Sequence, residues 1–118
     1  MTPASKSLYY FGFYLLLTGI LLTVAPNFVL AAVQIEETKE VWIHVLGAVV
    51  FVIGLYYVFM APTNNALFMM LSVYARITIF IWFLIFVILT WAPPELMFFG
   101  LVDMAGAIWT YLLLKRQG

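Results

Sequence analysis

The sequence predicts an all-α membrane protein, a bundle of four transmembrane helices, from three observations. First, 67% of the 118 residues are hydrophobic and 8% are charged, whereas a soluble domain is nearer half apolar and a quarter charged. Second, a soluble domain of this size has too little interior to bury so much apolar surface. Third, the apolar residues fall into four runs of roughly 20 residues, the length that crosses a bilayer.

The four runs form one membrane domain over residues 1–118. Each run stops at a proline or at a charge, as expected where a chain leaves the hydrocarbon. Unpaired backbone groups are costly in lipid, so each span must be a helix or part of a closed barrel, and these runs lack the alternation of barrel strands. The predicted spans are residues 8–25, 41–61, 66–91 and 96–114.

The chain between the first two predicted spans has its own pattern. Residues 27–34 are apolar but short, and Pro26 separates them from the first span. We expect a short interfacial helix there, or a continuation of the first helix after a kink. Thr38 is a candidate N-cap for the second span.

The charges at the helix ends predict an orientation. Lys6, Lys115 and Arg116 flank the outer ends of the first and fourth spans. The connections between spans one and two and between spans three and four hold four glutamates and one lysine. Because lysine and arginine favour the cytoplasmic side, we expect both termini in the cytoplasm and the protein in a cell membrane.

Arg76 and Asp103 are the most informative residues, since each lies inside a predicted span. An Arg or Asp at mid-helix costs roughly 2.5–3.5 kcal/mol on insertion scales, and such groups usually face the bundle interior and pair. Helix geometry places Arg76 about 4–5 Å on the cytoplasmic side of the midplane and Asp103 about 3 Å on the other side. The sequence therefore predicts an Arg76–Asp103 ion pair between adjacent helices.

Further polar groups are expected beside this pair. Thr110 shares a small and polar helix face with Asp103, and Tyr74 could supply a hydroxyl from the third span. Three interpretations of the site stay open. The pair could only lock two helices together, could line a cavity that binds a small molecule, a lipid headgroup or an ion, or could face a second subunit.

His44 is the single histidine, four residues after Glu40 near the start of the second span. Residues at this spacing share a helix face, and imidazole can change protonation near neutral pH. The two residues could relay protons from the outer mouth toward Asp103. The simpler interpretation is an interfacial histidine hydrogen-bonded to a carboxylate or to water.

Several classes of function lack their residues in this sequence. There is no cysteine, which removes disulfides, thiolate ligands and a cysteine nucleophile. One histidine and scattered acids do not make a metal centre, and no glycine-rich phosphate loop occurs. Zero net charge without a basic cluster argues against nucleic-acid binding. We expect no catalytic residues, no metal and no cofactor, so an enzyme is the less favoured class.

Glycines mark one face on each of the first two spans. Gly12 and Gly19 lie seven residues apart, and so do Gly47 and Gly54. Seven residues make two helical turns, so each pair allows close approach of another helix. Ordinary helix packing is the first interpretation, and a shared ligand groove is the second.

Four segments resemble small bacterial four-helix membrane proteins, and the general plan is similar to that of DoxX-like membrane proteins. The segments are VWIHVLG at 41–47, GLYY at 54–57, YAR at 74–76 and FGLVDMAGAIW at 99–109. The resemblance to bacterial proteins implies a bacterial inner membrane, and the DoxX-like resemblance implies an accessory role beside membrane redox proteins.

Taken together, these patterns favour a non-enzymatic accessory protein, or one that binds a lipid or small hydrophobic ligand. Its expected partners are the bilayer and either a second copy or another membrane protein. The alternative is a small homodimeric proton-coupled transporter that uses Asp103 as its coupling carboxylate.

Overall fold

The computed structural model describes residues 1–36 and 40–117, and this part of the chain is helical without strands. Four helices are long and apolar enough to cross a membrane, over Pro3–Val24, Trp42–Thr63, Ala66–Ile88 and Pro94–Arg116, which confirms the prediction of four long apolar helices. The elements in order are α1 (Pro3–Val24), α2 (Pro26–Ala32), α3 (Trp42–Met60), the 3-10 turn η1 (Ala61–Thr63), α4 (Ala66–Ile88), the 3-10 turn η2 (Pro94–Leu96) and α5 (Met97–Gln117).

Three helix starts differ from the expected ones, those of α1, α3 and α5, the last two by one residue. α1 begins at Pro3 rather than at residue 8, because the Thr2 hydroxyl caps it by accepting from the Ser5 amide at 3.2 Å and proline suits the first helical position. α3 begins at Trp42 without a side-chain cap. Thr38, the expected cap, lies outside the described residues.

α4 ends at Ile88, three residues before the predicted end of the third span, in a Schellman motif. Thr90 takes the left-handed conformation with φ 61°. Its amide donates to Val87 O at 3.0 Å, and the Trp91 amide donates to Phe86 O at 2.9 Å. The rings of Phe86 and Trp91 stack with centroids 6.0 Å apart, which supplies the apolar contact typical of this motif.

α2 is a separate helix that packs on α1 and α3. It starts with Pro26 and ends in a second Schellman motif. Gln34 has φ 62°, its amide donates to Ala31 O at 3.1 Å, and the Ile35 amide donates to Leu30 O at 2.8 Å. The motif turns the chain back, so that Leu30 and Ile35 both face the interior of the bundle.

Glycines bring the backbones of α1 and α3 together. A Cβ atom added at Gly19 would lie 2.5 Å from Phe51 N, and one at Gly47 would lie 2.6 Å from Thr23 N. Gly12 and Gly54 are similarly close to the opposite helix. Because lipid tails are as apolar as the side chains, the hydrophobic effect does not drive helices together in a bilayer. Van der Waals contact at these glycines therefore stabilises the α1–α3 pair. The packing interpretation of the glycine faces is therefore confirmed.

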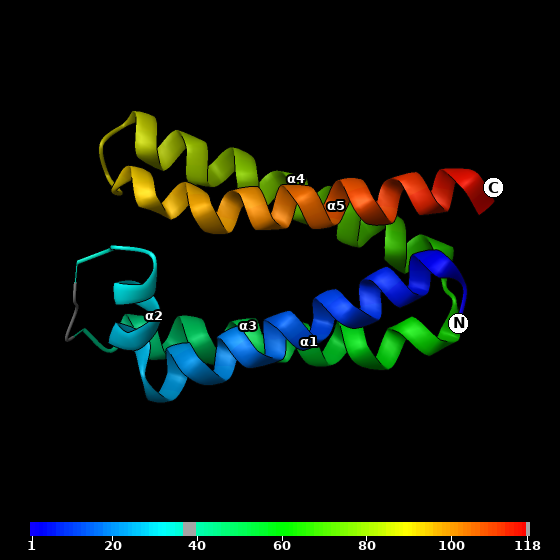
Figure 1. The fold of residues 1–118 in the computed structure, drawn as a ribbon, viewed down its shortest axis with the longest axis horizontal. Coiled ribbons are helices and arrows are strands. Elements are labelled where there is room, and N and C mark those ends of the chain that lie inside the picture. The colour runs from blue at the N-terminus through cyan, green and yellow to red at the C-terminus, as the bar shows by residue number, and fades with distance from the viewer. Residues whose placement is uncertain (37–39, 118) are drawn as a thin grey trace.

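The bundle consists of two helix pairs, α1 with α3 and α4 with α5 (Figure 1). The pairs meet near the chain termini and diverge toward α2 (Figure 1). We call the end of the bundle where the pairs meet the closed end. There Asn64, between η1 and α4, connects α4 to the start of α1, because its Oδ1 accepts from the Thr2 amide at 3.0 Å and from the Ser5 hydroxyl at 2.7 Å. The core cluster comprises Ala4, Leu8, Phe11, Tyr57, Ala61 and Met69. It fills the closed end only.

Candidate functional site

Arg76 on α4 is buried between the two helix pairs and is only 2% exposed. Its Nε donates to Ser72 O at 3.2 Å, and its Nη2 donates to Ser72 Oγ and to Thr110 Oγ1, each at 3.1 Å. Its Cζ lies 4.7 Å from the centroid of the Phe11 ring and 5.6 Å from that of Tyr57. Hydrogen bonds and cation–π contacts thus connect one cation to all four long helices.

The hydroxyls around Arg76 form a directed chain. Ser7 donates to Ala4 O at 2.6 Å, so the 2.8 Å bond between Ser7 and Thr110 takes its proton from Thr110. The Thr110 oxygen is then left to accept from Arg76. We call Ser7, Ser72, Arg76 and Thr110 the polar layer. It crosses the bundle on the closed side and joins α1, α4 and α5.

The expected direct ion pair between Arg76 and Asp103 is absent from the contacts of these two described residues. The guanidinium points toward Thr110, which follows Asp103 by seven residues, or about 10 Å along the helix. Neutral acceptors on α4 and α5 therefore take the place of the carboxylate. The Nη1 atom of Arg76 is buried without a hydrogen-bond partner, and a Cβ at Gly106 would lie 3.1 Å from it.

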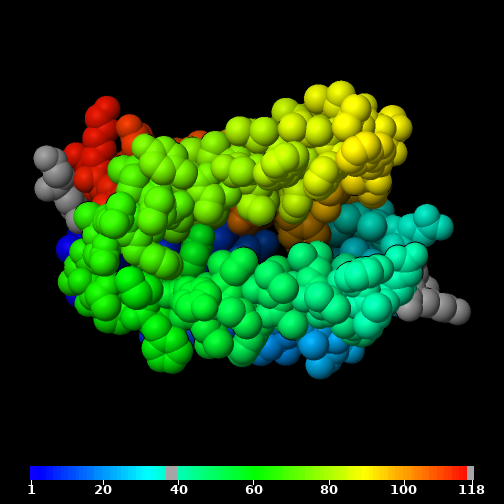
Figure 2. Space-filling model, turned by 180° about the vertical axis from the view of Figure 1, so that it is seen from behind, coloured from blue at the N-terminus to red at the C-terminus, as the bar shows by residue number. Residues whose placement is uncertain are grey.

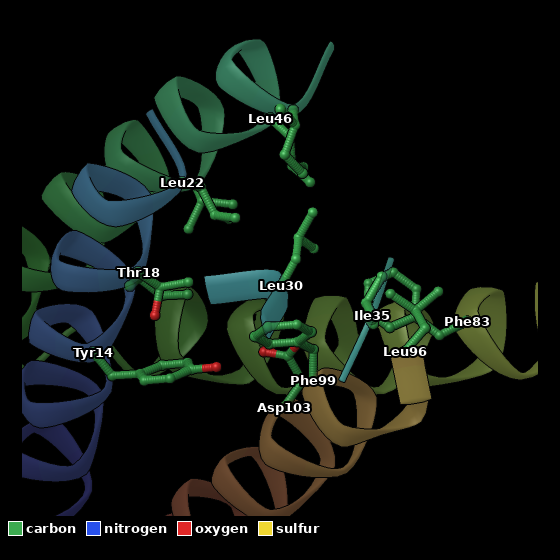
Figure 3. A pocket seen from close by; sticks show the side chains of 13 residues that line it. Tyr14, Thr18, Leu22, Leu30, Ile35, Leu46, Phe83, Leu96, Phe99 and Asp103 are labelled. Atoms are coloured by element: carbon green, nitrogen blue, oxygen red, sulfur yellow. The ribbon is translucent and has the colours of Figure 1, made fainter. Parts of the chain in front are cut away.

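A cavity of about 150 Å³ lies where the two helix pairs diverge (Figure 3). Its walls are apolar apart from Tyr14, Thr18 and Asp103, which come from α1 and α5. The other lining residues are Leu15, Leu22, Leu30, Ile35, Ile43, Leu46, Val50, Phe83, Leu96 and Phe99. α2 and the chain after it cover one end of this space through Leu30 and Ile35.

Asp103 gives the cavity its one acidic group. Its carboxylate accepts no hydrogen bond from residues 1–36 or 40–117, and the Tyr14 hydroxyl points toward it (Figure 3). An ionisable group inside a span usually finds a partner. A carboxylate that faces an apolar cavity without one is therefore a candidate binding group.

The surface is hollowed between α3 and α4, on the face opposite that of Figure 1. Figure 2 shows a recess between the bands of these helices, with atoms of α1 and α5 at its floor. α3 and α4 belong to different pairs, and few contacts join them. The recess faces sideways with respect to the long helices, so it would open into the bilayer rather than into water.

The accessory polar residues predicted from the sequence separate into two groups. Thr110 belongs to the polar layer and is fully buried. Tyr74 is 59% exposed on α4 and does not line the cavity. His44 donates from Nδ1 to the Thr23 carbonyl oxygen and so fastens the start of α3 to the end of α1. Glu40 is exposed, precedes α3 and does not line the cavity either.

Four polar residues of the site were not among those predicted from the sequence: Ser7, Tyr14 and Thr18 on α1 and Ser72 on α4. Tyr14 and Thr18 lie four residues apart on α1, one turn of the same face, and Ser7 lies one turn further toward the N-terminus from Phe11. The spacing of the polar residues within the first apolar run could have identified this face. Their small number among so many apolar residues concealed it.

The positions of the possible metal ligands, His, Cys, Asp and Glu, test whether a metal ion could bind. Within the described residues, no group of three or more His, Cys, Asp or Glu side chains is close enough to hold a metal ion.

Comparison with known proteins finds no relative, since no protein-family model, curated protein or solved structure matches the chain. The DoxX-like resemblance therefore stays a prediction.

Proposed function

We propose that this protein is a non-enzymatic membrane protein that binds a small, mainly apolar ligand taken up sideways from the bilayer. The observation that carries the proposal is a mostly apolar cavity lined by one carboxylate, that of Asp103, which accepts no hydrogen bond from the described residues. Pockets of this kind bind through an apolar wall and are given orientation by a few polar groups. Asp103 supplies that orientation here.

The recess between α3 and α4 supports the lateral route (Figure 2). The polar layer and the core cluster fill the bundle on the side of the termini, so a ligand in the cavity is separated from that end. The arrangement favours binding and release at one mouth.

Co-purification of a ligand tests the proposal. Native mass spectrometry of the detergent-purified protein should show an added mass, and Val50→Phe should lose it, because Val50 lines the cavity and a phenyl ring would fill part of it. Val49→Phe is the matched control, since the neighbouring Val49 is 51% exposed on α3. Equal loss in both variants, or no bound mass in any preparation, would contradict a ligand in this cavity.

The carboxylate in the cavity also favours a second candidate, a small homodimeric proton-coupled transporter in which Asp103 takes up and releases the proton. Such a protein must open the polar layer during its cycle, because that layer closes one end of the pathway. Uptake driven by a proton gradient in proteoliposomes, lost in Asp103→Asn, would favour transport. Uptake equal to that of empty liposomes would leave the binding function alone.

We also propose that both termini are cytoplasmic and that the protein resides in a bacterial inner membrane. The end of the bundle with the termini carries Lys6, Lys115 and Arg116, whereas the opposite end carries Glu36, Glu40 and Glu95. This distribution agrees with the excess of basic residues in cytoplasmic segments.

A further inference from the structure

We infer that the cavity takes a protonated organic amine, with its ammonium group at Asp103 and its apolar body against the aliphatic wall. This inference rests on the proposed ligand-binding function and specifies the ligand's chemical class. Three features of the described residues carry it: the charge that the cavity presents, the aromatic rings near that charge, and the volume.

The charge that the cavity presents is negative. Asp103 lines the cavity, whereas Arg76 does not and no lysine or arginine appears among the lining residues. Arg76 is enclosed by Phe11 and Tyr57, and its hydrogen bonds go to Ser72 and Thr110. A ligand in the cavity therefore meets the carboxylate and not the guanidinium, which favours a cation with N–H donors over an anion.

Aromatic rings stand beside the carboxylate. Phe99 precedes Asp103 by one helical turn on α5, so the two side chains are neighbours on one face, and both line the cavity together with Tyr14 and Phe83 (Figure 3). Aromatic faces attract ammonium groups, most strongly where water is excluded. A carboxylate with adjacent rings is thus a suitable site for an organic ammonium.

The rest of the wall suits an organic cation better than a metal ion. Calcium and magnesium require about six oxygen ligands, and the side chains that line the cavity provide oxygens only from Tyr14, Thr18 and Asp103. An amine needs one acceptor for its ammonium and an apolar surface for its carbon atoms. Leu22, Leu30 and Leu46 provide such a surface.

The volume sets the size of the ligand. At about 150 Å³ the cavity matches an apolar cavity known to hold benzene. A single aromatic ring with a one-carbon amine therefore fills it. Benzylammonium is the corresponding probe, and benzyl alcohol and benzoate have nearly the same shape with no charge and with a negative charge.

Calorimetric titration of the protein in nanodiscs, referenced to empty nanodiscs, tests the inference. We expect benzylamine at neutral pH to bind at least about tenfold more tightly than benzyl alcohol, the factor that one charge-assisted hydrogen bond provides, and benzoate to bind least. Asp103→Asn should lower benzylamine affinity to that of benzyl alcohol and leave benzyl alcohol binding intact. Glu95→Gln, which removes an exposed carboxylate outside the cavity, should change neither affinity.

The outcomes separate the two proposals. Equal binding of benzylamine and benzyl alcohol, or full benzylamine affinity in Asp103→Asn, would overturn the amine and leave the ligand cavity in place. Absence of binding by all three probes would count against both. If Asp103→Asn does not fold, Phe99→Leu replaces it, and a loss of affinity no larger for benzylamine than for benzyl alcohol would again overturn the amine.

Discussion

At the scale of single residues, Arg76 shows how a cation is held in an apolar bundle without a carboxylate beside it. Ser72 and Thr110 accept its hydrogen bonds, and two rings cover its faces. These neutral acceptors place the hydrogen bonds of Arg76 on α4 and α5, and the bond between Thr110 and Ser7 extends the polar contacts to α1. Asp103 is thereby left to face the cavity.

Thr110→Val should destabilise the protein by about 1–3 kcal/mol, the cost of leaving a buried donor without its acceptor. The substitution keeps the side-chain shape, but it removes the oxygen that accepts from Arg76 and the proton given to Ser7. Thr78→Val is the matched control, because Thr78 is exposed on α4 and bonds only to the Tyr74 carbonyl. Reversible unfolding in mixed micelles measures both. If Thr78→Val destabilised the protein as much as Thr110→Val, the polar layer would contribute no more to the free energy of unfolding than an exposed hydroxyl does.

The sequence identified Arg76, Asp103 and Thr110 as interior residues, because a polar group in an apolar span has to avoid lipid. It could not identify their partners. Depth along a helix is predictable from a rise of about 1.5 Å per residue, but the direction of a long side chain is not. Arg76 extends toward Thr110 rather than toward Asp103, and only the packed helices decide between the two.

At the scale of elements, the contrast between the two helix pairs lies in their glycines. The α1–α3 contact is made backbone to backbone at four glycines, whereas Gly100 on α5 meets only the rings of α4, with Phe83 Cδ2 3.4 Å from an added Cβ. The first pair therefore has no room for a side chain, and the second pair has some.

Gly19→Ala should destabilise the protein by about 1–3 kcal/mol, the usual cost of overpacking. Its Cβ would lie 2.5 Å and 2.7 Å from the N and Cα atoms of Phe51, so the two backbones must separate. Gly100→Ala should be neutral or slightly stabilising, since its nearest neighbours are at ordinary contact distance and alanine is the better helix former. Thermal unfolding of the two variants side by side decides the point. Equal losses would mean that α1 and α3 can move apart freely.

The lengths of the elements were predictable from hydropathy, but their ends were less so. The third span was expected to continue to residue 91 because Leu89, Thr90 and Trp91 are not helix breakers. The Schellman motif places a β-branched threonine at φ 61°, a position where glycine is usual. With no glycine to mark it, this end was not visible in the sequence.

At the scale of the whole molecule, the two pairs form a wedge that is closed at the termini and open toward α2 (Figure 1). This arrangement was not predictable, because helices that are apolar all round show no preferred face. Glycine spacing predicted close packing but named no partner. The cavity follows from the angle between the pairs and not from any motif.

The orientation of this wedge can be tested directly, because the chain has no cysteine. Glu95→Cys in η2 should react with a membrane-impermeant maleimide in intact bacterial spheroplasts, and Thr63→Cys in η1 should react only after permeabilisation. Both positions are exposed, and neither change removes a basic residue that sets the topology. The cysteine-free parent gives the background. The reverse pattern would place the termini outside, and labelling of both variants in intact cells would indicate dual orientation.

The pairing of helices that are adjacent in the chain has a consequence for biogenesis. α1 and α3 can associate once both are in the membrane, before α4 has entered it, since chains fold from the N-terminus during translation. Ser7 and Phe11 are then already in place when Arg76 enters the membrane. Arg76 thus enters with the third span, when its contacts on α1 and α3 are already in the membrane, and Thr110 completes the surroundings as the last helix is released.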